Sequence, residues 1–411
     1  MKEIDTVVIG GGQAGLSTSF WLKQHGISHV VLERGEVGES WRSQRWDSFT
    51  LNTPNHLNIL PGEHIGPQDE NGFWNRDELV VRLEQYAAKC ELPIAPRVAV
   101  TAVNWSETES AFIIDTSRDS YLANRVVVAS GSQNQPKISS IQTQISPTIH
   151  QIHAADYRSA DQLPEGAVLV VGSAQSGVQI AESLIESGRN VYLSTSKVGR
   201  VRRRYRGKDL TEWAVITGMA EQTVEDLDDP AQAKAPQPQI SGRHGGETLS
   251  LQSLEARGVV LLGRLASYQE GLFHFSDNLP ENINFADQVS QGFCKTLDDT
   301  IEALKLTVAP VEADPADNAD TQAEHREIIL ELSAKETGIS SVIWSTGFDG
   351  NFDWLKCAAR DEYGIPIHHN GISPQSGLYF CGFPWLRNRI SGLICGAAAD
   401  AEFIAGKIAR G

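Results

Sequence analysis

Hydrophobic and polar positions repeat one arrangement twice along this chain: a short apolar run, a glycine-rich turn and a helical pattern. The two arrangements occupy residues 4–25 and 168–187, and short apolar runs at 29–32 and 191–193 follow them. Continuously apolar runs that end at glycines predict buried parallel strands. Each arrangement therefore predicts a strand–turn–helix–strand unit.

Periodicity outside the two units predicts further helices and strands. Residues 74–92 place apolar side chains at helical spacing, and a C-terminal helix is expected from Ile394. The apolar positions of the first of these helices are Leu79, Val80, Leu83, Tyr86 and Ala87. Alternating or β-branched runs predict strands near Val98–Val103 and at 112–114, 121–122, 125–128, 328–330, 342–344 and 377–382.

These elements predict an α/β fold with two Rossmann-like dinucleotide-binding domains, because each glycine turn lies between a strand and a helix. We expect the first domain to be discontinuous and to comprise residues 1–155 and 335–411. The second domain, inserted into it, is expected at 160–334. Polar stretches near 225–245 and 313–324 are expected to be irregular insertions in the second domain.

The first glycine turn has the GxGxxG spacing that suits a bound pyrophosphate. Its first glycine makes the bend, its second lets the backbone approach the phosphates, and its third lets helix and strand pack closely. Glu33 ends the next strand 23 residues after Gly10, where a carboxylate accepts hydrogen bonds from ribose hydroxyls. The residues expected at the phosphates are Gly10, Gly12, Gln13, Ala14 and Gly15.

The second glycine turn reads GSAQSG, with an alanine at its middle position. Alanine costs little there if its φ is negative, because it adds one methyl group and no backbone strain. The residues expected to contact a dinucleotide in this turn are Gly172, Ala174, Gln175, Ser176 and Gly177.

The strand after the second turn ends in Ser194, 22 residues after Gly172, where the first unit has an acid. No carboxylate at this position repels a 2′-phosphate, and six basic residues follow between 200 and 208. This contrast favours NADPH over NADH. We expect Ser194, Ser196, Arg202 and Arg204 near the coenzyme; the alternative for any single arginine is a solvated surface position.

Glu33 and the RGEVGESWR that follows it at 34–42 contain an E-x-x-x-x-G-x-x-W stretch from Glu33 to Trp41. This stretch resembles the flavin-dependent monooxygenases, a family of flavoproteins with two dinucleotide-binding domains, and ASG at 129–131 and STGF at 345–348 resemble the family's hinge segments. The resemblance implies FAD in the first site and NADPH in the second. Further residues expected beside these cofactors are Arg34, Ser40, Trp41, Arg42, Val98, Ser130, Gly131, Thr346, Gly347, Gly382 and Leu393.

The resemblance is incomplete in two places. His153 and Tyr157 match the second half of the family's fingerprint before the coenzyme loop, whereas Pro147 and Ile149 replace the Phe and Gly of its first half. Phe383 stands where an aspartate usually follows the last glycine. The alternative for His153 and Tyr157 is packing at the hinge between the domains.

Asn52 is the candidate catalytic residue, because Asn52-Thr53-Pro54 resembles the family's N-x-P turn beside the reactive flavin edge. The resemblance implies that Asn52 holds the nicotinamide or a C4a-(hydro)peroxyflavin; alternatively, Asn52 and Pro54 only build a turn. It further implies an FAD- and NADPH-dependent monooxygenase that oxygenates a small amine or sulfide. The alternatives are a flavin reductase or dehydrogenase without oxygen insertion, and a non-catalytic flavin redox sensor.

Composition narrows the partners and the location. A net charge of −17 argues against nucleic acid, and five cysteines without a CxxC pair argue against a zinc site, a disulfide framework or a disulfide reductase. The acidic N-terminal residues do not resemble a signal peptide, and the longest uncharged stretch contains three prolines. We therefore expect a cytoplasmic enzyme with a small-molecule substrate, O2, no metal and no membrane span. A homo-oligomer is compatible with the sequence.

Overall fold

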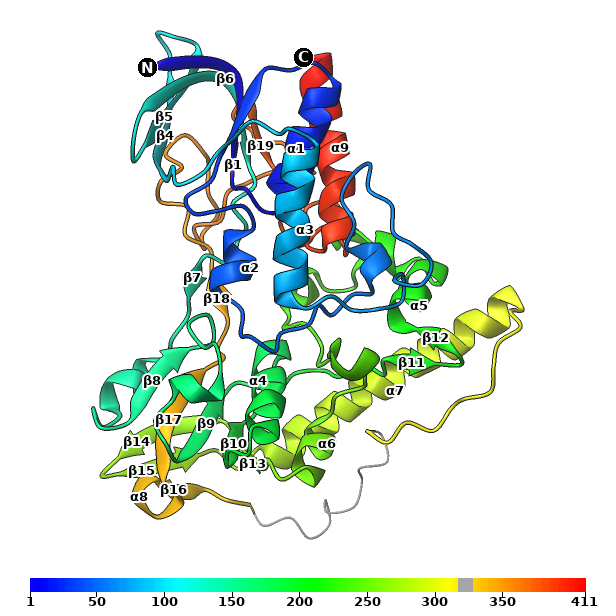
Figure 1. The fold of residues 1–411 in the computed structure, drawn as a ribbon. Helices are drawn as coiled ribbons and strands as arrows, with labels where there is room; N and C mark the ends of the chain where they lie inside the picture. Colours follow the sequence, from blue (N-terminus) through cyan, green and yellow to red (C-terminus); the bar gives the residue numbers. More distant parts are fainter. Residues whose placement is uncertain (317–327) are drawn as a thin grey trace.

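The chain folds into two α/β units, each built around its own sheet (Figure 1). The computed structural model describes residues 1–316 and 328–411. The first sheet takes strands from both ends of the chain, and the second sheet takes its strands from the middle. The predicted α/β fold, with a discontinuous first unit and an inserted second unit, is therefore confirmed.

The first sheet has the strand order β3-β2-β1-β6-β5-β4, with β19 beside β6. Strands β4, β5 and β6 form an antiparallel meander, and the other pairs are parallel. The strands are β1 (Lys2–Ile9), β2 (His29–Leu32), β3 (Ile94–Ala95), β4 (Val100–Ser106), β5 (Ala111–Thr116), β6 (Ser120–Val128) and β19 (Leu378–Phe380). The helices of this unit are α1 (Gln13–Gln24), α2 (Glu39–Ser43), α3 (Arg76–Lys89) and α9 (Ile394–Arg410).

The second sheet is parallel throughout and has the order β13-β10-β9-β17-β8. Its strands are β8 (His150–His153), β9 (Ala167–Val171), β10 (Val191–Ser194), β13 (Val260–Leu262) and β17 (Ile339–Trp344). An antiparallel layer packs beside it, formed by β14 (Leu265–Gln269), β15 (Leu272–Phe275) and β16 (Glu331–Ser333). The helices are α4 (Gln175–Glu186), α5 (Leu210–Ile216), α6 (Leu251–Ala256), α7 (Leu279–Leu304) and α8 (Ala334–Thr337).

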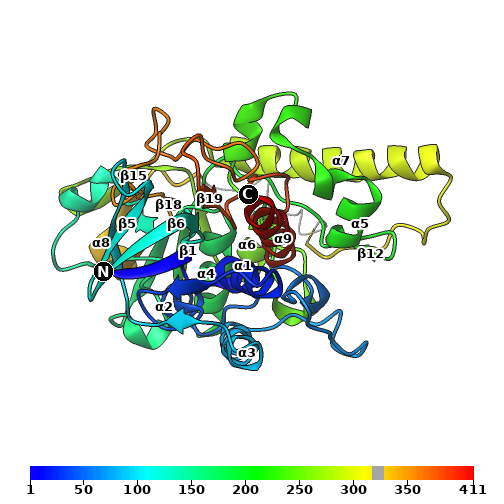
Figure 2. The ribbon, with the colours of Figure 1, turned by 90° about the horizontal axis from the view of Figure 1, so that it is seen from above.

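One end of α7 extends away from the body of the second unit, together with α5 and the short strands β11 (Arg204–Tyr205) and β12 (Lys208–Asp209) (Figures 1 and 2). Trp213 of α5 and Leu297 of α7 are fully buried in one apolar cluster at this end. Between α5 and α6 the chain contains single-turn helices and no strand. Of the stretch 313–324, only residues 313–316 are described, and Asp314 and Ala316 accept hydrogen bonds from Thr248 and Ser250.

The expected helix at 74–92 is confirmed as α3, and all five of its predicted apolar positions are buried. Two strand predictions were wrong in extent. The runs 121–122 and 125–128 belong to one strand, β6, because the pairing with β1 keeps its register from Ala123 to Arg125. The strand expected at 328–330 lies instead at Glu331–Ser333 (β16) and begins three residues later, where pairing with β15 starts.

The two connections between the units pair with each other. Strand β7 (Gln135–Pro136) runs antiparallel to β18 (Phe348–Asp349), and the Lys137 N–H donates to the Gly347 carbonyl at 3.0 Å. Gly347 has φ +87°, a left-handed conformation that glycine adopts without strain. The outgoing and returning chains therefore cross between the units as one hydrogen-bonded ribbon.

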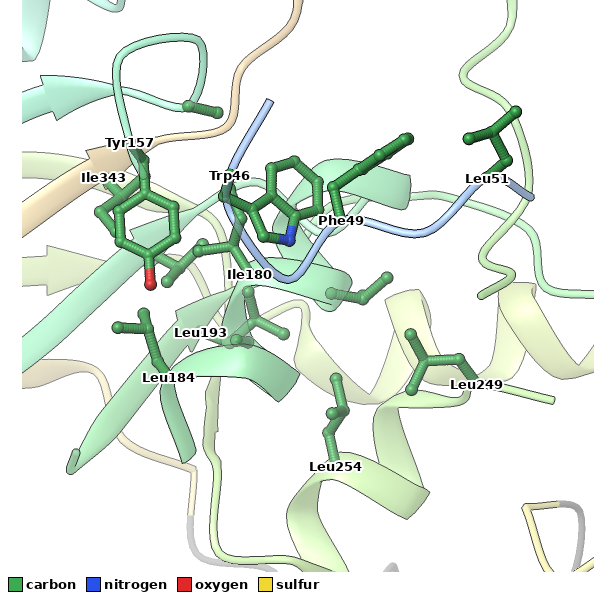
Figure 3. Close-up of a cluster of buried hydrophobic side chains, with 14 of the residues drawn as sticks. Trp46, Phe49, Leu51, Tyr157, Ile180, Leu184, Leu193, Leu249, Leu254 and Ile343 are labelled. Atoms are coloured by element: carbon green, nitrogen blue, oxygen red, sulfur yellow. The ribbon is translucent and has the colours of Figure 1, made fainter. Parts of the chain in front are cut away.

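A single apolar cluster spans both units (Figure 3). Trp46, Phe49 and Leu51 come from the first unit and are 2%, 7% and 2% exposed. The indole of Trp46 meets the Phe49 ring edge-to-face at 5.1 Å, and both rings share their buried cluster with Ile180 and Leu184 of α4. Segment 46–52 is therefore a wedge of the first unit, inserted into the core of the second.

Helices α1 and α9 lie side by side (Figures 1 and 2), and α9 carries a buried carboxyl group. Asp400 is 1% exposed, and Arg387 Nη1 lies 3.3 Å from its Oδ1. Burial raises the pKa of Asp400 to about 6, although Ser391 and Arg387 lower this pKa in part.

No helix among the described residues is long and apolar enough to cross a membrane.

Asp400→Asn is expected to stabilise the protein above pH 6 and to leave it nearly unchanged below pH 4. Between these values the folded chain keeps a proton on Asp400 that the unfolded chain has released, so this group costs stability as pH rises. The cost approaches about 3 kcal/mol at pH 8. Urea unfolding midpoints of variant and wild type at pH 4 and pH 8 measure it. Asp299→Asn, at an exposed position on α7, is the control; an equal Asp400→Asn effect at both pH values would contradict the assignment.

Candidate functional site: two glycine loops and the wedge between them

The two glycine turns have the same backbone geometry. Gly10 and Gly172 have φ of +113° and +106°, values that L side chains rarely adopt. A Cβ on Gly10 would lie 2.5 Å from the Ala129 carbonyl oxygen, and one on Gly172 would lie 2.4 Å from the carbonyl oxygen of Ser345. The left-handed turn and the close approach to a neighbouring strand end thus both require glycine at the first position.

The third glycine of each turn is equally constrained. A Cβ on Gly15 would lie 1.8 Å from the Gly10 carbonyl oxygen, and one on Gly177 would lie 1.8 Å from that of Gly172. The first helical turn therefore packs directly on the backbone of the bend in both units. This is the helix–strand contact expected of the third glycine.

The middle position does not require glycine. Gly12 has φ −84° and ψ −173°, and Ala174 has φ −74° and ψ −176°. No heavy atom lies within 4 Å of the point where Gly12 would carry a Cβ. Since φ is negative at both positions, the alanine of the second turn adds a methyl group without backbone strain, as expected.

Both turns leave a helix N-terminus ready for an anion. The N-caps of α1 and α4, Gly12 and Ala174, provide no side-chain hydrogen bond to the first-turn N–H groups. Such free N–H groups and the helix dipole bind phosphates. The open space at Gly12, with half-buried Gln13 and buried Ala14 beside it, fits the pyrophosphate of a dinucleotide.

Glu33 is buried and already oriented at the end of β2. Its two carboxylate oxygens accept from the N–H groups of Gly11 at 2.6 Å and Gly35 at 2.8 Å. The Val98 N–H donates to the Glu33 backbone carbonyl at 2.8 Å. These contacts hold the acid and Val98 beside the first turn, where the sequence predicts the ribose of the dinucleotide.

The stretch after Glu33 divides into inward and outward side chains. The Trp41 indole N–H donates to Gln13 Oε1 at 2.9 Å, which ties α2 to the start of α1. Arg34 and Ser40 are exposed, and Arg42 pairs with Glu84 of α3 at 2.7 Å. Of the residues predicted here, Trp41 is the one that directly contacts the phosphate turn.

The end of β10 differs from that of β2. Ser194 is 2% exposed, and its hydroxyl donates to the Gly263 carbonyl at 3.1 Å and accepts from the Leu265 N–H at 2.9 Å. The Ser196 N–H donates to Ser173 Oγ at 3.0 Å, next to the second turn. Lys197 is exposed, with its amine 3.3 Å from Glu281. No carboxylate closes this strand.

The basic run is largely paired within the protein. Arg202 is 7% exposed, with Nη2 on the Glu312 carbonyl at 2.9 Å and Nε 3.7 Å from Asp314. Arg204 donates to the carbonyls of Gly245 and Gly246 at 2.7 Å each. A 2′-phosphate role for Arg202 or Arg204 therefore requires exchange of these partners, a constraint that the sequence pattern does not reveal.

Asn52 lies at the tip of the wedge, against the helix of the second turn. Its side-chain N–H donates to Gln175 Oε1 at 3.1 Å, and its side-chain carbonyl accepts from Gln179 Nε2 at 2.9 Å. Its backbone carbonyl accepts from Arg203 Nη1 at 2.6 Å. The structure thus brings Asn52 and the second turn together. Sequence reasoning did not identify Gln179 and counted Arg203 only in the basic run, because no local pattern marks a residue whose partner lies on the other unit.

The hinge residues lie beside the two turns. Ser130 and Gly131 follow β6, and Gly131 has φ +70° with no atom within 4 Å of its Cβ position. Thr346 donates to the Lys137 carbonyl across the paired connections. His153 Nε2 donates to the Gly347 carbonyl at 3.0 Å, and its Nδ1 accepts from the Ala155 N–H at 3.1 Å.

These contacts support a packing role for His153 and Tyr157. Burial lowers the pKa of His153, whose two ring nitrogens are both used within the hinge. Tyr157 is fully buried in the cluster of Figure 3, and burial raises its pKa to about 12. Neither side chain is placed as an acid or base at the glycine turns.

The C-terminal segment completes the first site. A Cβ on Gly382 would lie 2.5 Å from that of Ala14, so the turn after β19 packs on the first glycine loop. Phe383 is buried and meets the Phe380 ring edge-to-face, which gives the position of the missing aspartate an apolar role. Leu393 is the N-cap of α9 and provides no side-chain cap, so its first-turn N–H groups are unpaired by side chains.

Comparison with known proteins identifies the family. Residues 7–217 match the model of the pyridine nucleotide-disulphide oxidoreductase family, and the chain belongs to this family. It is 31% identical to an uncharacterized oxidoreductase, CzcO, of Bacillus subtilis over 97% of both chains. It is 29% identical to a probable indole-3-pyruvate monooxygenase, YUCCA1, of Arabidopsis thaliana over 46% of each chain.

The fold is also that of a solved flavin enzyme. The flavin-containing monooxygenase of Stenotrophomonas maltophilia superposes with a TM-score of 0.63 and 19% identity, covering 100% of this chain and 99% of that one. The predicted resemblance to flavoproteins with two dinucleotide-binding domains is therefore confirmed.

Gly177→Ala is expected to abolish dinucleotide binding at the second turn, whereas Ala174→Gly is expected to change the affinity less than about twofold. The added Cβ at 177 would overlap the Gly172 carbonyl, and the turn must open. Calorimetric titration with NADP⁺ measures the affinity of both variants, and their melting temperatures show whether they are folded. Wild-type affinity in folded Gly177→Ala would show that this turn does not hold the coenzyme.

Proposed function

We propose that this member of the pyridine nucleotide-disulphide oxidoreductase family is an FAD- and NADPH-dependent monooxygenase that oxygenates the nitrogen or sulfur of a small soft nucleophile. The observation that carries the proposal is the pair of unequal glycine loops on one continuous core. Glu33 closes the first loop and Ser194 closes the second, with Asn52 hydrogen-bonded to the helix of the second. Residues 1–155 and 335–411 would bind FAD, and 160–334 would bind NADPH.

The first unit offers what FAD needs. The free N–H groups of α1 and the open space at Gly12 suit the pyrophosphate, and Glu33 suits the ribose hydroxyls. The N-terminus of α9, at Leu393, offers positive potential to the flavin ring system. A bound flavin, reduced by the nicotinamide, would supply the activation of O2; this chemistry belongs to the cofactor.

The chain's own residues position the reactants and exclude water. The buried wedge of Trp46, Phe49 and Leu51 fixes the distance between the two loops and keeps solvent out of the space behind them. Asn52, at the tip of this wedge, is oriented to donate one hydrogen bond to the reacting group. Exclusion of water matters because stray protons release H2O2 in place of transferred oxygen.

A disulfide reductase, which the family description also covers, is disfavoured by the cysteines. The five cysteines are free, and no two of them have the CxxC spacing of a redox-active pair. Burial raises the pKa of Cys357 to about 11, that of Cys381 to about 12, and that of Cys395 as well. A thiol must ionise to attack a disulfide, so these three are poor nucleophiles. A flavin reductase without oxygen insertion remains the second candidate.

Oxygen transfer is tested with ¹⁸O2. The purified flavin-loaded protein is expected to oxidise NADPH faster with a substrate from a panel of amines and sulfides, and to place one ¹⁸O atom in the product. Mass spectrometry measures the label, and a peroxide assay measures the remainder. If NADPH reduces the flavin under nitrogen but all oxygen consumed appears as H2O2, the protein is a reductase. If NADPH does not reduce the flavin, the redox-sensor alternative stands.

The coenzyme preference is tested at the end of β10. We expect Lys197→Glu to raise the KM for NADPH by about tenfold and to change the KM for NADH little, because it places a carboxylate beside a 2′-phosphate. Lys295→Glu, on α7, is the matched control.

The double variant Arg202→Ala/Arg204→Ala separates the two candidate positions for the phosphate. If the double variant loses the preference for NADPH over NADH while Lys197→Glu keeps it, the 2′-phosphate binds at the basic run. An unchanged preference in all of these variants would overturn the assignment of NADPH.

A further inference from the structure

Three side-chain amides form a continuous chain between the two units. Gln179 of α4 is 3% exposed and donates both of its N–H groups, to Asn52 Oδ1 at 2.9 Å and to the Ile240 carbonyl at 2.7 Å. Asn52 donates to Gln175 Oε1 at 3.1 Å, and Gln175 donates to the Pro238 carbonyl at 3.2 Å. The chain therefore begins and ends on backbone carbonyls.

These two carbonyls give the chain a single direction. A carbonyl only accepts, so Gln179 must turn its amide nitrogen toward Ile240 and thereby toward Asn52. Asn52 must then present its oxygen to Gln179. From the other end, Gln175 must turn its nitrogen toward Pro238 and its oxygen toward Asn52, which must present its nitrogen. Both ends require the same orientation of Asn52.

The orientation leaves Asn52 with one donor to use. An amide nitrogen carries two N–H groups, and within the described residues one of those of Asn52 donates to Gln175 while the other has no protein acceptor. If the Asn52 amide were inverted, an oxygen would take the place of this free donor. The Asn52 nitrogen would then face the donating N–H of Gln179. The amide chain thus decides whether Asn52 donates or accepts at the site.

Segment 238–240 is itself held on the second glycine turn. Gln239 is fully buried, and its side-chain N–H donates to the Ser173 carbonyl at 2.8 Å. The Gln239 backbone N–H donates to the Gly199 carbonyl at 2.8 Å. The carbonyls that set the direction of the amide chain therefore belong to the second unit, whereas Asn52 belongs to the first.

We infer that Gln179, together with Gln175, is a positioning residue that fixes Asn52 as a hydrogen-bond donor toward the reacting cofactors. This inference rests on the proposed function for its chemistry and on the amide chain for its geometry. It assigns the orientation of the candidate catalytic side chain to residues of the opposite unit. Asn52 is then correctly oriented only when the two units are docked.

The test uses Gln179→Met, which removes both donors while keeping the shape, and Gln179→Glu, whose carboxyl regains one donor when it is protonated. Both variants are expected to slow anaerobic flavin reduction by NADPH about tenfold at pH 8. Only Gln179→Glu is expected to recover as the pH falls through the pKa of the new carboxyl. A general packing defect would not produce that difference in pH profile.

A double-variant cycle and a control complete the experiment. In an Asn52→Leu background, Gln179→Met is expected to cause no further loss, because the amide that it positions is gone. Gln252→Met on α6, which removes a hydrogen bond to Asp287 outside the amide chain, is expected to reduce the flavin at the wild-type rate. Melting temperatures and flavin content confirm that each variant is folded.

The outcomes separate this inference from the proposed function. Wild-type reduction rates in both folded Gln179 variants, or equal further losses in the Asn52→Leu background, would overturn the positioning role. Absence of ¹⁸O transfer by the wild type would overturn the monooxygenase proposal but would leave the reduction-rate test of Gln179 intact.

Discussion

The insertion of segment 46–52 into the core of the second unit is the contact on which the rest of the candidate site depends. Trp46 and Phe49 are nearly fully buried among residues of α4 and its sheet, and truncation of a buried aromatic of this kind costs about 3–5 kcal/mol. The same segment ends in Asn52, so the apolar contacts that dock the units also carry the candidate catalytic amide to the second glycine turn. Docking and orientation are therefore parts of one interaction.

Much of the fold follows from local constraints that are visible in the sequence. The glycines at 10, 15, 172 and 177 are required by a left-handed φ or by a backbone contact shorter than a Cβ allows, and such constraints leave the same pattern wherever the turn occurs. The alanine at 174 was interpretable for the same reason, since negative φ tolerates it. The helix α3 was predictable because five buried side chains repeat at helical spacing.

The polar partners at the site were not predictable, because each depends on a residue far away in the chain. Arg202 reads as a free cation in the sequence, yet residues 312–314 accept its hydrogen bond and lie close to its guanidinium. Gln179 reads as one polar position on a helix, yet it contacts Asn52, which is 127 positions earlier. Strand β6 also depended on a distant partner, since its pairing with β1 keeps one register across the break between its two apolar runs.

The ribbon formed by β7 and β18 has a consequence for how this chain can be divided. Because the second unit is entered and left through two strands that pair with each other, its ends lie close together. The chain topology would therefore allow recombination to exchange this unit as one continuous segment. The contacts between the units oppose such an exchange, because the replacement would also have to pack around segment 46–52 and supply the carbonyls that orient Asn52. Exchange of the second unit would therefore also exchange the groups that orient Asn52.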